Sequence, residues 1–399
     1  ADMVSGARLL ERAAALLPGG SPERLSHLAD SCEALLATGR AGEIGERARR
    51  GIEEARAAED RCAEARLRLW QLMVDEAVTP DEPPVNELET LDETLTECGD
   101  DPGIAQVREA LAHIAWITND ADRAITNMQK GLVAAYRAQA RTLLSRMAVS
   151  YLTILTAGPL AVRDALARFE GVGPIAQLSS FVEIALKANA ALLFALDGHF
   201  DVARLSLADA EAIQVGLMQP PWVARIPRTA ALIELAAGDP GAAFQRASED
   251  LDDLLSIAHP AGIDAAAVAA RALCASQRPA EALAIAERAL VALSEVTASE
   301  APETSPGELH ALRARALAPH SRAEAIDAIS ESDASPPAPV RLVQAADRLV
   351  DVAVANAALG DASQARARLQ EAIGLYEGKG ATVLSRRARD ILESGAKNL

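Results

Sequence analysis

Apolar and small side chains recur at three- and four-residue spacing along nearly the whole chain, and no stretch shows the strict alternation of a half-buried strand. The stretch 345–376 shows this pattern most clearly. It predicts a helix ending near Leu359, a Gly360-Asp361 turn and a second helix beginning at Ala362. We therefore expect an all-α protein built from helical hairpins.

A fixed frame of small residues surrounds the predicted turn. Relative to Gly360, a small residue lies seven positions before (Ala353), five after (Ala365) and twelve after (Ala372). Two helical backbones approach closely only where side chains are small, and a residue that tolerates positive φ ends the first helix. The same frame surrounds Gly39, Asn119, Gly198, Gly238 and Gln277, where only Ile44 and Asp250 are not small. Such recurrence indicates tandem repeats.

The repeat unit is about 40 residues long, because the regularly framed turns lie one or two such units apart. This spacing requires weaker turns near Thr79, Gly158 and His320, and a helix breaker stands at each place: Pro80, Gly158-Pro159 and Pro319. A chain of this length then holds about nine hairpins.

The frame resembles the tetratricopeptide repeat, in which a small residue lies in helix A, a glycine ends it and two small residues follow in helix B. The unit is longer than the usual 34 residues, and aromatic residues make up only 3% of the chain. The resemblance implies a right-handed α-solenoid with ligands on the face of the first helices. We expect a final helix, Lys379–Glu393, to cover the open end of the stack.

Proline- and glycine-rich segments divide this solenoid into parts. We expect repeats one to seven with an N-terminal helix over 1–296, a flexible loop or hinge over 297–307, and repeats eight and nine with the capping helix over 308–399. The segment 171–174 is expected to be a loop. The acidic tract 249–253 is expected to be a solvated helix face.

Charge and composition narrow the class of protein. The 399 residues carry a formal net charge of −18, the pI is about 4.9 and the mean hydropathy is +0.07. An acidic chain is repelled by a nucleic-acid backbone or an anionic membrane, so neither is an expected partner. No apolar run is long enough to span a bilayer. The Ala-Asp start suggests a fragment of a longer protein.

The four cysteines, Cys32, Cys62, Cys98 and Cys274, form no close pair in the sequence and have no histidine at ligand spacing. We interpret them as small buried core residues in a reducing compartment, which places the protein in the cytoplasm.

Both ends of the chain carry a second resemblance. The stretches 9–18, 359–361 and 376–382 look like the corresponding parts of large actinobacterial signalling proteins. Those proteins join an ATP-binding switch module and a nucleotide-cyclase or LuxR-type DNA-binding output to a long tetratricopeptide-like arm. The resemblance implies that this chain is the arm alone, and that its own upstream ATPase module is one candidate partner.

Sequence motifs for catalysis are missing. The chain contains no GxxxxGK[ST], HExxH, GxSxG or Cys-x-x-Cys, and its histidines are isolated. We therefore expect no enzyme activity, no cofactor and no metal site.

The tetratricopeptide frame places ligand-facing residues thirteen, ten, nine and six positions before each turn. Applied to repeats six and seven, it selects Arg225, Arg228, Asp264 and Arg271. Trp222 lies one helical turn before Arg225 and could give the ligand an apolar contact surface. Arginine suits bidentate capture of a carboxylate, so these residues predict a groove for an acidic or C-terminal peptide. The alternative is pairing of the arginines within the chain, with Asp264, Glu234 or the acidic tract.

Two further positions come from the same frame. His113 lies on the expected ligand face of repeat three, beside Gln106 and Glu109, although the neighbouring Trp116 is equally explained as core. Asn189 lies in an otherwise apolar strip of repeat five that could line a pocket for a small molecule. The leading hypothesis is a non-catalytic scaffold that binds a protein or peptide. The alternative is a sensor that encloses a small molecule.

Overall fold

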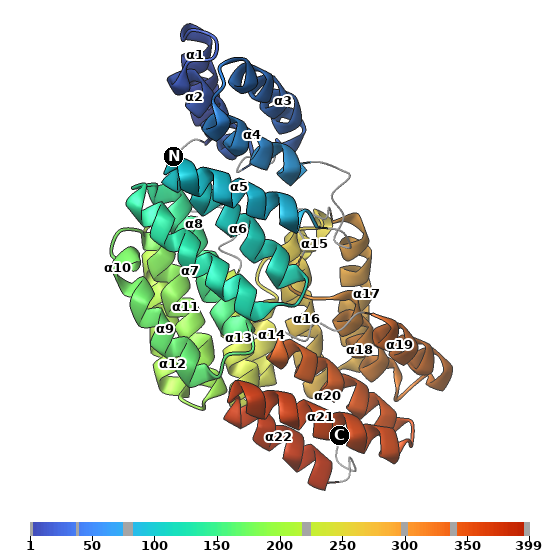
Figure 1. Ribbon diagram of the computed structural model, residues 1–399. Coiled ribbons are helices and arrows are strands. Elements are labelled where there is room, and N and C mark those ends of the chain that lie inside the picture. The colour runs from blue at the N-terminus through green and yellow to red at the C-terminus, as the bar shows by residue number, and fades with distance from the viewer. Residues whose placement is uncertain are drawn as a thin grey trace. The chain divides into compact units, whose positions relative to one another are not determined.

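The protein is all-α in the computed structural model, which describes residues 3–36, 40–74, 83–217, 225–296, 302–335 and 341–394 (Figure 1). Consecutive helices pack as hairpins, so the predicted fold class is confirmed. The chain divides into two compact units, Ala1–Tyr151 (unit 1) and Leu152–Leu399 (unit 2), whose boundary falls inside one helix.

The first eight helices supply unit 1. They are α1 (Met3–Leu16), α2 (Pro22–Leu36), α3 (Ala41–Ala57), α4 (Arg61–Val74), α5 (Val85–Cys98), α6 (Asp101–Ile117), α7 (Ala121–Arg137) and α8 (Arg141–Ala157), of which the last turn of α8 belongs to unit 2.

Unit 2 continues with α9 (Val162–Phe169), a 3-10 turn η1 (Glu170–Val172), α10 (Gly173–Ala176), α11 (Ser180–Leu196), α12 (Phe200–Val215), α13 (Arg225–Ala237), α14 (Pro240–Ala247), α15 (Leu251–Ser256), α16 (Pro260–Ala275), α17 (Pro279–Glu295), α18 (Pro306–Leu317), α19 (Arg322–Ala334), α20 (Leu342–Ala358), α21 (Ala362–Lys379) and α22 (Thr382–Glu393). The turn near Gly158 and the turn at His320 lie where the spacing predicts them, whereas Gly39 and Thr79 lie outside the described residues.

The predicted turn residues adopt the left-handed conformation that the frame requires. Positive φ angles occur at Asn119 (64°), Gly198 (92°), Gly238 (89°), Gln277 (58°) and Gly360 (86°). Such a residue stops the first helix and lets the next amide bond back to the helix end. At Gly360 the following Asp361 N–H donates to Asn356 O at 2.9 Å.

An aspartate after the turn residue begins the second helix in several repeats. The side chains of Asp120, Asp239 and Asp361 accept a hydrogen bond from the backbone N–H three residues later, at 3.0, 2.9 and 3.0 Å. Each bond satisfies one of the amides that a helix start leaves unpaired. The Gly-Asp or Asn-Asp pair therefore encodes both the end of one helix and the start of the next.

Small residues of the frame lie where helices touch. Ala191, Ala203, Ala231 and Ala270 are fully buried. A Cβ atom at Gly131 would lie 2.3 Å from Met147 Cε on α8, 3.0 Å from Arg108 Cβ and 3.3 Å from Ala105 O on α6, so any larger residue would force these neighbours to shift. Close backbone approach is thus the reason for the alanine-rich composition.

Two local expectations are wrong. Segment 171–174 is not a loop, because it forms the end of η1 and the start of α10. The acidic tract 249–253 is not one helix face, because Asp250 has φ 56° and separates α14 from α15. Asp250 is one of the two frame positions where the sequence lacks a small residue, and it is here that helix B is broken.

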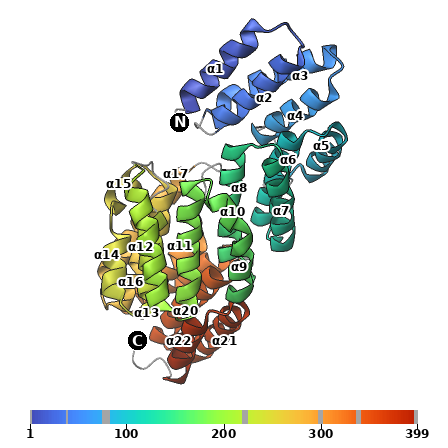
Figure 2. The same cartoon turned by 90° about the vertical axis from the view of Figure 1, so that its left-hand side faces the viewer.

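The final helix α22 packs on α21, the last helix of the stack, as predicted, and it also reaches the middle of the chain. Lys379 ends α21, and α22 lies beside the lower ends of α11 and α13 (Figures 1 and 2). The glycines at those ends make room, since a Cβ at Gly198 would meet Val383 at 3.3 Å. Arg387 donates to Leu235 O and Ala236 O, the last-turn carbonyls of α13, at 2.8 and 3.2 Å. The C-terminal helix therefore covers helix ends from the middle of the chain.

Lys379 makes the other contact of this hairpin. Its side chain is completely buried, and Nζ donates to Gly158 O at 2.8 Å and Leu155 O at 3.2 Å. Leu155 O has no helical donor, because the residue four positions later is Pro159 and has no N–H. The ammonium group thus replaces a missing backbone donor at the end of α8.

The expectation for the cysteines is wrong for one pair. Cys62 at the start of α4 and Cys98 at the end of α5 form a disulfide with a Cα–Cα distance of 6.0 Å. Cys98 is exposed and Cys62 half-buried. Cys32 and Cys274 are buried free thiols, as predicted, and burial raises their pKa to about 12 and about 11. The sequence could not show the pairing because it joins residues 36 positions apart.

Reduction of this disulfide is expected to destabilise unit 1 by about 3–4 kcal/mol, because the bond closes a long loop in the unfolded chain. Chemical denaturation with and without a thiol reductant measures the effect. The Cys98→Ser variant serves as the control, since its stability should already be low and should not change with reductant. Equal midpoints for the oxidised and reduced wild-type protein would contradict the prediction.

Candidate functional site

Charged residues from successive first helices of unit 2 meet in one buried group, which we call the inner ion network. They come from α13, α16, α18 and α20, together with the segment before α18. The members are Arg228, Asp264, Arg271, Glu303, Glu308, Arg315, Asp347 and Asp351.

Asp351 is the centre of one half of the network. Its carboxylate is 1% exposed and accepts hydrogen bonds from Nε of Arg271 on α16 at 3.0 Å and from Arg315 on α18 at 2.8 Å. Arg271 also reaches Asp347 at 3.2 Å. Burial alone would lower the pKa of Arg271, but Asp351 and Asp347 raise it overall. Two guanidinium groups therefore hold one buried carboxylate, and three helices are joined through it.

The other half of the network holds a short irregular piece of the chain, residues 302–305, which bends at Glu303 and Thr304. Asp264 on α16 accepts from the backbone N–H of Thr304 at 2.7 Å and of Glu303 at 3.3 Å. Arg228 on α13 binds the Glu303 carboxylate at 2.8 Å, and Arg341 donates to the Glu303 carbonyl. Thr304 is 3% exposed. The segment is thus bound through the Glu303 side chain, the backbone amides of Glu303 and Thr304, and the Glu303 carbonyl.

Two acidic groups near this segment are shifted towards the neutral form. Burial raises the pKa of Glu308 to about 7, although the Ser305 N–H, which donates to it at 2.8 Å, opposes the shift. Burial also raises the pKa of Asp347, against the effect of Arg271. The inner ion network is therefore poorly hydrated, and its hydrogen bonds contribute more than surface ones.

The structure brings together three of the predicted site residues: Arg228, Asp264 and Arg271. Both arginines pair with acidic residues of the same chain, so pairing within the chain, the alternative weighed from the sequence, is what the structure contains. Their partners, however, are Glu303, Asp347 and Asp351. The side chain of Arg225, at the start of α13, and the whole of Trp222 lie outside the described part.

The acidic partners were missed, although the same frame contains them. Asp347 and Asp351 stand thirteen and nine positions before Gly360, which are ligand-facing positions in the tetratricopeptide frame. Applying the frame to the last framed repeat as well as to the middle ones would have selected these aspartates as ligand-facing residues, but not their pairing with the arginines.

Asn189 and His113 lie apart from this network. Asn189 on α11 donates to Ala185 O of its own helix at 2.8 Å. His113 on α6 belongs to unit 1 and is exposed, and desolvation lowers the pKa of its ring while Glu109 opposes the shift. The segment 297–307 was expected to be flexible. Residues 302–305 of it are held as described above, and 297–301 lie outside the described residues.

Unit 1 has a smaller polar cluster on its own first helices. Arg146 on α8 binds Glu109 on α6 through both carboxylate oxygens, at 2.6 and 2.9 Å, and Glu33 on α2 at 3.2 Å. Gln106 donates to Glu33 at 2.8 Å. The predicted residues Gln106 and Glu109 thus do face neighbouring first helices. Glu33, six positions before Gly39, was available from the same frame.

Within the described segments, no three His, Cys, Asp or Glu side chains converge as metal ligands would. Among the helices that the structure describes, none is long and apolar enough to cross a bilayer.

Comparisons with known proteins add little beyond the fold. No protein-family model matches the chain, and no curated protein sequence matches it. One solved structure, described as a circular tandem repeat protein with novel repeat topology and enhanced subunit contact surfaces, is similar at 15% identity, covering 99% of this chain and 92% of that one. Its TM-score of 0.23 carries no argument about shape or function. The chain is an all-helical tandem-repeat scaffold.

Proposed function

We propose that this scaffold is a non-catalytic, regulatory binding protein whose inner ion network recognises short, bent acidic segments of protein partners. The observation that carries the proposal is the capture of residues 302–305 by Asp264 and Arg228. Both residues stand at positions that the sequence frame assigns to ligand contact, and both already hold a peptide segment.

The contacts have the chemistry of peptide recognition. A carboxylate that accepts two consecutive backbone N–H groups binds a bent piece of chain, because consecutive amides of an extended strand point to opposite sides, and it does so without regard to the side chains. An arginine that binds the neighbouring glutamate adds a preference for acidic sequence. The buried Nε of Arg228 has no hydrogen-bond partner among the described residues.

In this proposal residues 302–305, the resident segment, compete with a partner for Arg228 and Asp264. A segment tethered on both sides is present at high effective concentration, so a free peptide binds weakly until the tethered one is displaced. The likeness of the chain ends to signalling ATPases supports an upstream ATPase module as one candidate partner. Under this proposal the partner gains access when the resident contact is lost.

A peptide with the sequence of residues 302–308 tests the proposal. Glu303→Ala removes the resident carboxylate, and we expect the labelled peptide to bind this variant roughly tenfold more tightly than the wild type. Adding Arg228→Glu to the same variant should abolish the gain. Fluorescence anisotropy measures all three affinities.

Glu324→Ala is the matched control, because Glu324 is an exposed glutamate on α19. It should leave peptide binding at the wild-type level. Equal affinities for wild type, Glu303→Ala and the Arg228→Glu double variant would show that Arg228 and Asp264 only fasten the segment before α18. The scaffold would then need another binding face.

A further inference from the structure

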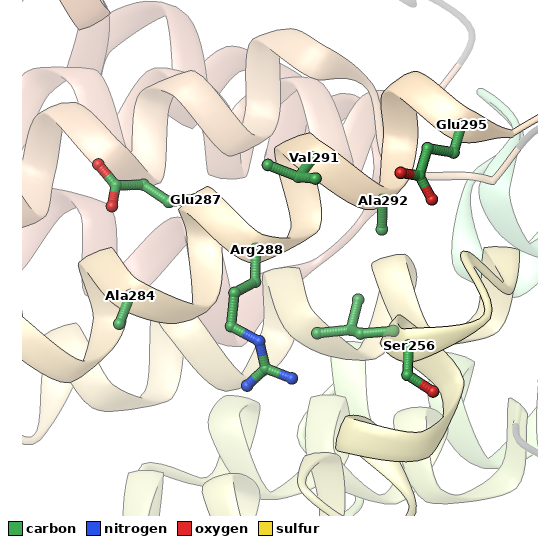
Figure 3. Close-up of a pocket in the computed structure, with 8 residues that line it drawn as sticks. Ser256, Ala284, Glu287, Arg288, Val291, Ala292 and Glu295 are labelled. Atoms are coloured by element: carbon green, nitrogen blue, oxygen red, sulfur yellow. The ribbon is translucent and has the colours of Figure 1, made fainter.

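A shallow groove lies on the surface of unit 2 between α15 and α17, apart from the inner ion network (Figure 3). Its apolar lining comes from Leu255 on α15 and from Ala284, Val291 and Ala292 on α17. The α17 residues that line it include Ala284, Val291 and Glu295, which follow one another at helical spacing along one face. The groove therefore runs along α17.

The break at Asp250 creates one wall of this groove. Because Asp250 is left-handed, helix B of this repeat continues as the separate α15, which packs on α16 and touches α17. The chain leaves α15 through Ile257, which is 70% exposed. Val291 on the opposite wall is 63% exposed. Val291, a large β-branched side chain, thus stands in solvent beside a buried floor of Leu255 and Ala292.

The rim of the groove is acidic. Glu287 and Glu295 lie on the α17 side, and Asp252 on α15 reaches the rim through Arg288. Arg288 is the basic residue of the lining. It points towards the gap in Figure 3, and it is paired with Asp252 at 2.8 Å. Arg313 lies 3.7 Å from Glu287. Negative charge remains in excess around an apolar floor.

We propose that this groove is a docking site for a basic amphipathic helix of a partner protein. A helix that lies along α17 would place its apolar stripe on Val291 and Leu255, and lysine or arginine on its flanks would meet Glu287 and Glu295. A second copy of this chain is disfavoured as the occupant, because each copy carries a formal net charge of −18. The inference stands independently of peptide capture by Arg228 and Asp264.

Binding of a model peptide tests this site. The probe is a labelled helical peptide of leucine and lysine, about five turns long, with the leucines on one face. We expect saturable binding to the full chain by fluorescence anisotropy, and protection of α15 and α17 in hydrogen exchange. Val291→Asp should weaken binding roughly tenfold, because it places a carboxylate under the apolar stripe.

Two matched controls separate docking from general attraction between a basic peptide and an acidic protein. Leu205→Asp introduces the same charge at another exposed apolar residue, a leucine on α12 that is 70% exposed. This variant should bind the peptide with unchanged affinity. A peptide of identical composition, permuted so that leucine and lysine do not separate, should bind at least tenfold more weakly. Equal binding of the permuted peptide, or equal affinities of the Val291→Asp variant and the wild type, would overturn the proposal.

Discussion

Replacing Asp351 by asparagine is expected to destabilise unit 2 by about 3–5 kcal/mol, the cost of breaking a buried ion pair from one side. The change leaves Arg271 and Arg315 buried without the carboxylate that both of them contact. Since these arginines lie on α16 and α18, the loss should loosen the packing of three first helices together. Chemical denaturation of the full chain measures the change.

The matched control is Asp327→Asn, at an exposed position of α19. It should change stability by less than about 0.5 kcal/mol. A second variant tests the cause: replacing Arg271, Arg315 and Asp351 together by apolar residues should recover much of the loss, because a buried ion group and a well-packed apolar one are often similar in stability. A small effect for Asp351→Asn would mean that water reaches the network.

The stability of unit 2 is expected to rise between pH 7 and pH 9 because of Lys379. Burial lowers the pKa of this side chain from its usual 10.5 to about 7. Above pH 7 the folded chain has released the proton that the unfolded chain still binds, so raising the pH favours the folded state. Below pH 7 both states are protonated, and the cost of the buried charge is present in full.

Lys379→Met removes this dependence. Between pH 7 and pH 9 the stability of the variant relative to the wild type should fall by roughly 2 kcal/mol, measured by denaturation at each pH. Lys130→Met, at an exposed position of α7, is the control and should show no comparable change. A stability difference between Lys379→Met and wild type that stays constant from pH 6 to pH 9 would show that the hydrogen bonds to Leu155 and Gly158 outweigh the burial.

Much of the fold could be predicted because its determinants are local. Gly360 and Asp361 end one helix and begin the next through bonds that span only a few residues. Ala353 and Ala365 are small because two adjacent backbones meet there. Fixed sequence offsets identify all of these residues. They did not predict that helix B ends at Asp250, where the frame position holds a residue that is not small.

The site was predicted only in part, for a related reason. The frame selected Arg228, Asp264 and Arg271 as residues of the ligand-facing side, and the structure places them in one network. It gave no partners, because Arg271 pairs with residues 76 and 80 positions away. Which first helices come opposite one another depends on the packing of several repeats, and this is not contained in one repeat.

The sequence by itself therefore determined the helical hairpins, their turns and the small residues between them, since these depend on backbone conformation and on contacts within one repeat. Only the tertiary structure decided that Cys62 meets Cys98, that Lys379 reaches a carbonyl 221 residues earlier, and that the arginines meet acidic residues of their own chain. Those contacts form where distant helices pack together, and small differences in packing over many repeats determine which side chains come within bonding distance.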